Sequence, residues 1–111
     1  MRAAPFFYGC WDDTIAAHAG AEFEDRSPAA AEGFYADGVF DPGVTRARLT
    51  RLTAPVLVIA GGLDAAPTPR RAAELADLFP NGRLAVDPAA AHYPWITGPS
   101  LFVETIDDFL R

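Results

Sequence analysis

The chain has 111 residues, of which half are hydrophobic and 22% charged. This length and composition suit one folded domain and exclude an intrinsically disordered protein. The formal net charge of −6 leaves no surplus of cations to neutralise phosphates, so we expect neither a nucleic-acid nor a membrane partner. With Cys10 as its one cysteine, the chain can form neither an internal disulfide nor a cysteine-based metal site. The absence of a signal peptide and of a bilayer-spanning apolar run predicts a cytoplasmic protein.

The first part of the chain, residues 1–52, predicts a helical segment. Three expected helices follow capping residues: Asp12 or Asp13 before residues 15–24, Ser27-Pro28 before 28–35, and Asp41-Pro42 before 44–52. No strand-like alternation of polar and apolar residues occurs in this segment.

The second part, residues 53–111, changes character. Residues 56–60 have the sequence VLVIA, an apolar run typical of a strand buried on both faces of a parallel sheet. A helix over residues 70–79, begun by Pro69, a shorter strand over 83–87, a loop and a closing helix over 99–111 follow. The expected apolar sides of the two helices consist of Ala72, Leu75, Ala76 and Phe79 in the first and of Phe102, Ile106, Phe109 and Leu110 in the second.

A strand, a helix and a second strand in this order predict a βαβ unit with parallel strands and a right-handed crossover. The expected fold class is therefore α/β. One such unit supplies only two strands, whereas a parallel sheet needs cover on both faces. This mismatch suggests that the chain is a fragment of a larger sheet.

Two polar residues follow the expected strands, Asp64 after the first and His92 after the second. Ligand and active sites of open α/β sheets form outside the carboxyl ends of the strands. An aspartate there can fix the tautomer of a histidine, whose other ring nitrogen then acts as a general base. Taken alone, each residue is more often a turn, cap or surface residue, but their matching positions favour catalytic roles.

The order of elements around these residues resembles a known pattern. A strand that ends in G-x-x-D is followed by a helix, a strand, a loop with a histidine, and a helix with a P-x-x-F start and an F-L end, here at Gly61 and Asp64, His92, Pro99 and Phe102, and Phe109-Leu110. This segment, Leu52 to Arg111, resembles the C-terminal end of the α/β-hydrolase superfamily. One departure is Ala90-Ala91 before the histidine, where many members have glycine, so the loop is expected to sit differently.

The resemblance implies an α/β-hydrolase parallel sheet and a serine-type hydrolase, with Asp64 and His92 as triad acid and base. It implies hydrolysis of a small-molecule or peptide substrate, an ester or an amide, without a cofactor. Residues 1–52 resemble the end of the helical cap segment that these hydrolases carry, together with the helix that leads into the strand before Asp64. Residues 53–111 resemble the C-terminal segment of the hydrolase core. Among subgroups, the chain looks most like proline iminopeptidase-like and tripeptidyl-aminopeptidase-like proteins.

No residue of the chain fits the nucleophile of this pattern, which precedes the acid in a G-x-S-x-G turn. Ser27 is placed as a helix cap, Ser100 follows the histidine, and Cys10 has a glycine only before it. We therefore expect the nucleophile in a missing N-terminal hydrolase half.

Other sites are weaker candidates. Asp87 is a rival for the triad acid, and a metal site built from His18 and His92 would be accidental, so we expect no metal. Five aromatic residues could line a substrate pocket or fill a core: Tyr8, Trp11, Phe34, Tyr35 and Trp95. We favour the core, except for Trp95, where the two interpretations are even.

Two functions thus remain open. The chain is either part of a hydrolase, or a non-catalytic remnant or interaction module that pairs an open strand edge with another chain.

Overall fold

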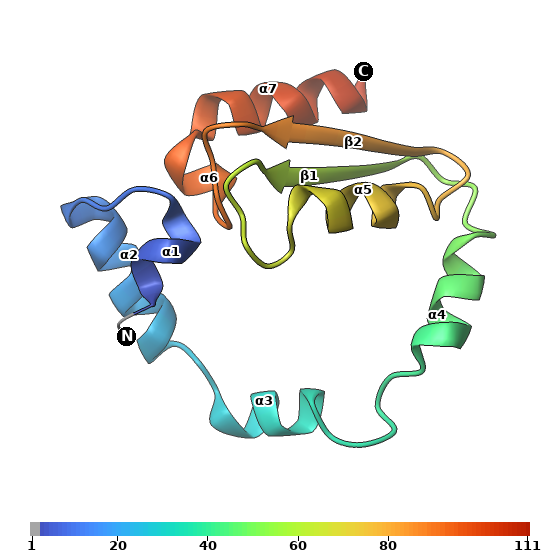
Figure 1. The fold of residues 1–111 in the computed structure, drawn as a ribbon, viewed down its shortest axis with the longest axis horizontal. Coiled ribbons are helices and arrows are strands. Elements are labelled where there is room, and N and C mark those ends of the chain that lie inside the picture. The colour runs from blue at the N-terminus through green and yellow to red at the C-terminus, as the bar shows by residue number, and fades with distance from the viewer. Residues whose placement is uncertain (1–2) are drawn as a thin grey trace.

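The computed structural model describes residues 3–111 and has α/β architecture, with helices and a two-stranded parallel sheet (Figure 1). The elements are α1 (Ala4–Tyr8), α2 (Asp13–Glu24), α3 (Pro28–Phe34), α4 (Pro42–Leu49), β1 (Val56–Gly61), α5 (Pro69–Ala76), β2 (Gly82–Asp87), α6 (Pro94–Thr97) and α7 (Pro99–Leu110). No helix among the described residues is both long enough and apolar enough to cross a membrane.

The three helices expected in the first part are present with their caps. The side chains of Asp12, Ser27 and Asp41 each accept a hydrogen bond from a backbone N–H in the first turn of α2, α3 and α4. Helix α4 ends before residue 52 because the N–H groups of Arg51 and Leu52 donate only three residues back, to Arg48 and Leu49. Helix α1 was not expected, since five residues without a side-chain cap give no helical period.

Helices α3 and α4 form an arc that links α2 to β1 and stands away from the sheet (Figure 1). All of α3 is exposed, and so is α4 except for the half-buried Leu49. We refer to residues 28–49 as the α3–α4 arc.

The expected βαβ unit is confirmed in the second part. Strands β1 and β2 pair in parallel, with Val56 opposite Gly82 and Gly61 opposite Asp87. Helix α5 ends at Ala76, three residues earlier than expected, because the N–H groups of Leu78 and Phe79 donate only three residues back, to Leu75 and Ala76. The short α6 lies inside the segment that was expected to be a loop.

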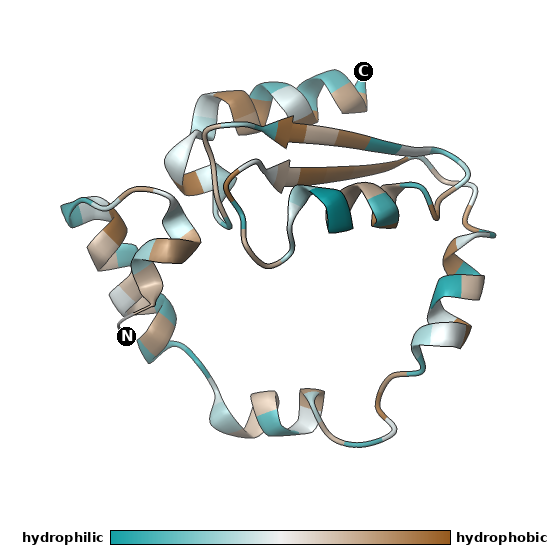
Figure 2. Cartoon of the chain, in the orientation of Figure 1, coloured by the Kyte–Doolittle hydropathy of each residue, from teal (hydrophilic) through white to brown (hydrophobic). Residues whose placement is uncertain are grey.

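Helices α5 and α7 lie on opposite faces of the sheet, whose strand β1 is mostly hydrophobic while β2 also has hydrophilic residues (Figures 1 and 2). The cover is incomplete: residues 56–59 of β1 are only half-buried, and Leu84 and Val86 of β2 are exposed. The expectation of a first strand buried on both faces is therefore wrong for most of β1, because two helices cannot enclose the sheet. Leu110, expected on the buried face of α7, is 74% exposed at the C-terminal end of that helix.

One edge of β1 has no neighbouring strand among the described residues. The backbone N–H groups of Val56 and Gly62 donate to β2 and its flanks, at 3.1 Å and 2.7 Å. Because backbone groups alternate between the two edges of a strand, those of Leu57 and Ile59 point to the open edge.

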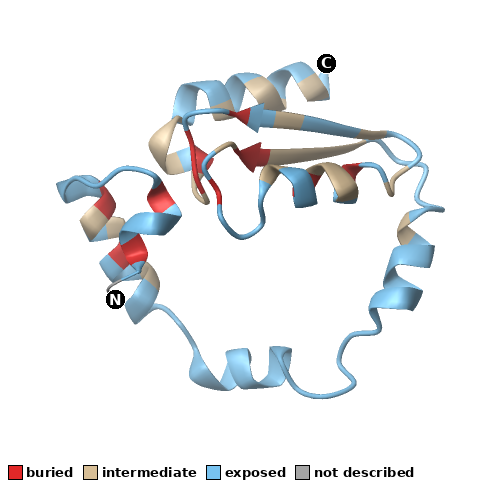
Figure 3. Cartoon of the chain, in the orientation of Figure 1, coloured by how far each residue is buried: buried red, intermediate tan, exposed pale blue. Residues whose placement is uncertain are grey.

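Buried residues gather at the carboxyl ends of the strands and where α1 and α2 meet the chain before α6 (Figure 3). The second group contains Ala4, Tyr8, Ile15 and Ala19, with Tyr93 and Ile96 packed against it. Tyr8 thus belongs to a core, as expected. The same expectation is wrong for Trp11, Phe34 and Tyr35, which are all exposed. Phe34 and Tyr35 lack cover because they belong to α3 and its C-terminal cap, which stand away from the sheet.

Candidate active site

Two loops leave the carboxyl ends of the strands and run side by side. We call residues 62–68, after β1, the acid loop, and residues 88–93, after β2, the histidine loop. The N–H of Gly62 donates to the carbonyl of Asp87 at 2.7 Å, and that of Leu63 donates to the carbonyl of Ala90 at 2.9 Å. The backbone itself therefore fixes the spacing of the two loops.

This close approach depends on two glycines. A Cβ at Gly61 would overlap the carbonyl oxygen of Ala91, and one at Gly62 would stand 2.8 Å from the Cα of Pro88. At both positions a side chain would collide with backbone atoms of the neighbouring loop, so only glycine fits there. In the sequence, Gly61 is recognisable as the glycine of the G-x-x-D pattern, and paired glycines at the end of a strand can also indicate a close backbone contact.

The structure brings Asp64 and His92 together. Nδ1 of His92 lies 2.9 Å from Oδ2 of Asp64, and Oδ1 of Asp64 accepts the N–H of Ala66 at 2.9 Å. An ionised carboxylate only accepts hydrogen bonds, so Nδ1 of His92 is the donor and Nε2 is left as the acceptor. The Asp64 side chain is 7% exposed and that of His92 37%, so the acid is enclosed while the imidazole can be reached.

The histidine loop accommodates alanines before the histidine without strain. Ala90 and Ala91 are buried, and no described residue other than glycine has a positive φ. Ala91 packs against Gly61, so here a glycine across from the loop provides the room.

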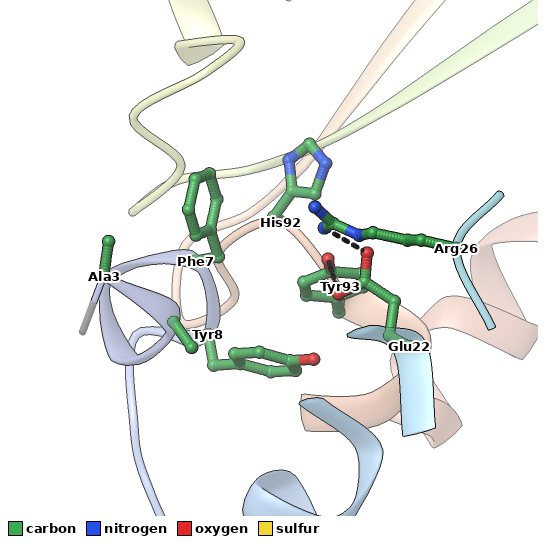
Figure 4. Close-up of a pocket in the computed structure, with 8 residues that line it drawn as sticks. Ala3, Phe7, Tyr8, Glu22, Arg26, His92 and Tyr93 are labelled. Atoms are coloured by element: carbon green, nitrogen blue, oxygen red, sulfur yellow. Dashed lines mark hydrogen bonds and ion pairs between the residues drawn. The ribbon is translucent and has the colours of Figure 1, made fainter. Parts of the chain in front are cut away.

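His92 lines two pockets. The first, of about 370 Å³, is lined by Phe7, Tyr8, Glu22, Arg26 and Tyr93 as well as His92, and by Ala3 and Ala4 (Figure 4). The second is a groove of about 360 Å³ along residues 58–61 of β1, walled by α5, Trp95 and Phe102. Asp64 lines only the groove. His92 can thus be approached from two directions.

The rival residues have other roles. Asp87 accepts the N–H of Ala89 at 3.0 Å and closes a turn, and His18 is hydrogen bonded to the hydroxyl of Tyr8. Ser27 caps α3, Ser100 is exposed in the first turn of α7, and Cys10 is exposed. Within residues 3–111, no hydroxyl or thiol is hydrogen bonded to His92, and no group of three potential ligands could hold a metal ion.

No protein-family model matches the chain. A 66-residue segment, 60% of the chain, is 39% identical to the pimeloyl-[acyl-carrier protein] methyl ester esterase of Pectobacterium atrosepticum. That segment spans 26% of the length of this relative. The relative is an α/β-hydrolase and gives no support to a peptidase-like subgroup. The similarity therefore supports the resemblance to the α/β-hydrolases at the level of the superfamily and of hydrolases in general.

Proposed function

We propose that the chain is the C-terminal portion of a serine-type α/β-hydrolase that cleaves an ester. Asp64 is the triad acid and His92 the base, and the nucleophile lies outside these 111 residues. The contact that carries this proposal is the 2.9 Å hydrogen bond between Nδ1 of His92 and the enclosed carboxylate of Asp64. The esterase similar to this chain favours an ester over an amide as substrate.

The reaction follows from the tautomer of His92. Nε2 takes the proton of the serine hydroxyl while the serine oxygen bonds to the ester carbonyl carbon. The imidazolium that forms is stabilised by Asp64 and gives its proton to the departing alkoxide. Water then repeats the sequence on the acyl-enzyme and releases the acid. In this proposal His92, supported by Asp64, carries out the proton transfers both when the acyl-enzyme forms and when water hydrolyses it.

The first test concerns the nucleophile. The coding sequence upstream of the Met1 codon, translated in all frames, should contain a G-x-S-x-G between a strand and a helix. The chain joined to that segment, called the assembled hydrolase below, should hydrolyse a nitrophenyl ester, whereas the 111-residue chain alone should not. His92→Ala should abolish the turnover. Turnover by the chain alone that His92→Ala abolishes would contradict a nucleophile outside the chain, and Ser27→Ala and Ser100→Ala would then show whether either serine is that nucleophile.

The open edge of β1 favours a second candidate, an interaction module. The backbone groups of Leu57 and Ile59 point to this edge, and the groove beside it is walled by apolar side chains of α5 and by Phe102. An edge of this kind pairs with an extended strand of another chain through main-chain hydrogen bonds. A second copy of the chain, related by a two-fold axis, can supply that strand.

In this case Ile59→Pro should weaken self-association, with a Kd raised on the order of tenfold, because proline removes an N–H from the open edge. Sedimentation velocity over a range of concentrations measures the Kd. Val58→Pro is the matched control: Val58 faces β2, so proline there should disrupt the sheet itself. Self-association that is unchanged by Ile59→Pro would exclude pairing through β1.

A further inference from the structure

The C-terminal end of α1 rests on both loops of the candidate site. The carbonyl of Phe7 accepts the backbone N–H of His92 at 2.8 Å. Gly9 ends α1 with a φ of 73°, and a Cβ there would stand 3.2 Å from Cδ1 of Leu63 and 3.4 Å from Cβ of Ala91. The turn after α1 therefore lies against the acid loop and the histidine loop together.

Tyr8 joins this turn to α2 and to the residue after His92. It is 1% exposed, and its ring stacks on that of Tyr93 with centroids 4.4 Å apart. Its hydroxyl lies 2.6 Å from Nδ1 of His18 on α2. Stacked aromatic pairs of this kind are stabilising beyond the area they bury.

Tyr93 also has a polar contact with α2. Its hydroxyl donates to Glu22 at 3.1 Å, and Arg26 donates to the other oxygen of Glu22 at 2.7 Å (Figure 4). Burial, and then the bond to Glu22, raise the pKa of Tyr93 to about 12. The hydrogen bond from Arg26 is the main cause that lowers the pKa of Glu22. Near neutral pH the phenol is therefore a donor and the carboxylate an acceptor.

We infer that α1 and α2 form a brace that holds the imidazole of His92 against Asp64, with Phe7, Tyr8 and Tyr93 as positioning residues. The importance of the brace for catalysis rests on the function proposed above. His92 is held through its backbone by Phe7, through its neighbour by Tyr8, and through its ring by Asp64. The ring of Phe7 meets the imidazole edge-on, with centroids 5.9 Å apart. Such support preserves the geometry that proton transfer needs.

The test compares two variants of Tyr8 in the full chain. Tyr8→Phe retains the stack on Tyr93, whereas Tyr8→Leu removes it. In ¹⁵N-detected NMR, the wild type and Tyr8→Phe should show His92 as one tautomer with a protected Nδ1 proton. In Tyr8→Leu this proton should exchange with water at least about tenfold faster. The backbone amides of β1 and β2 should keep their exchange rates.

A protected Nδ1 proton in Tyr8→Leu would overturn the inference, and so would its loss together with the sheet amides, which would indicate a merely structural role. Tyr93→Phe provides a milder second variant, since it removes the bond to Glu22 and keeps the ring. It should accelerate exchange by a smaller factor than Tyr8→Leu. This readout needs no turnover: a failed ester assay with an intact brace would refute only the proposed function. Turnover with an unchanged Nδ1 signal in Tyr8→Leu would refute only the brace.

Discussion

Asp64→Asn should lower kcat of the assembled hydrolase by about 10⁴-fold, the loss typical when a triad acid becomes an amide. The asparagine Oδ1 can still accept the N–H of Ala66, so the acid loop should keep its shape. Its NH₂ group, however, donates towards Nδ1 of His92 and selects the tautomer with the proton on Nε2. That tautomer cannot take the proton of the nucleophile. Initial rates on a nitrophenyl ester measure the effect.

Two further substitutions define what this loss means. Asp87→Asn tests the rival acid. Its kcat should stay close to that of the wild type, because the side chain of Asp87 closes a turn by accepting the N–H of Ala89 and the Oδ1 of asparagine can do the same. Asp77→Asn, at an exposed position after α5, controls for the loss of one charge. A larger fall in Asp87→Asn than in Asp64→Asn would transfer the acid role to Asp87.

Gly61→Ala should destabilise the chain by about 1–3 kcal/mol, the usual cost of overpacking, and should separate the two loops. The new methyl group would overlap the carbonyl oxygen of Ala91 and lie 2.6 Å from that of Ala90. These are backbone atoms next to His92, so they cannot move aside without moving the imidazole from Asp64. Urea denaturation measures the free energy of unfolding, and NMR of the Nδ1 proton measures the separation.

Gly20→Ala in α2 is the matched control for this variant. Outside its chain neighbours and the backbone of its own helix, no atom lies within 4 Å of a Cβ at Gly20, so alanine should stabilise the helix by about 0.5–1 kcal/mol. If Gly61→Ala were as stable as the wild type and kept the Nδ1 signal, the two loops would not be locked by close contact.

Local signals in the sequence were enough for much of the fold. The capping side chains of Asp12, Ser27 and Asp41 act within four residues of themselves, so the sequence alone could locate their helices. The parallel pairing of β1 and β2 follows from a strand, a helix and a strand in succession. The same reasoning placed Asp64 and His92 at one end of the sheet, and the structure puts them in contact.

What could not be predicted depends on contacts between distant parts of the chain. Helix α1 is too short to show a period, and its bond from His92 to Phe7 joins opposite ends of the sequence. The exposure of Phe34 and Tyr35 depends on where the α3–α4 arc lies in space. An aromatic residue has the same apolar pattern whether or not a partner covers it.

The α3–α4 arc is the connection between two parts of the molecule that pack on each other, the brace and the sheet. The brace and the sheet meet at His92, while the chain between them, residues 28–49, is almost wholly exposed. The entropic cost of closing such a connection grows only slowly, by about 0.6 kcal/mol for each doubling of its length. The distance along the chain between Tyr8 and His92 therefore matters little to their packing. We therefore expect that extra residues can be inserted in the arc without moving Asp64 and His92 apart.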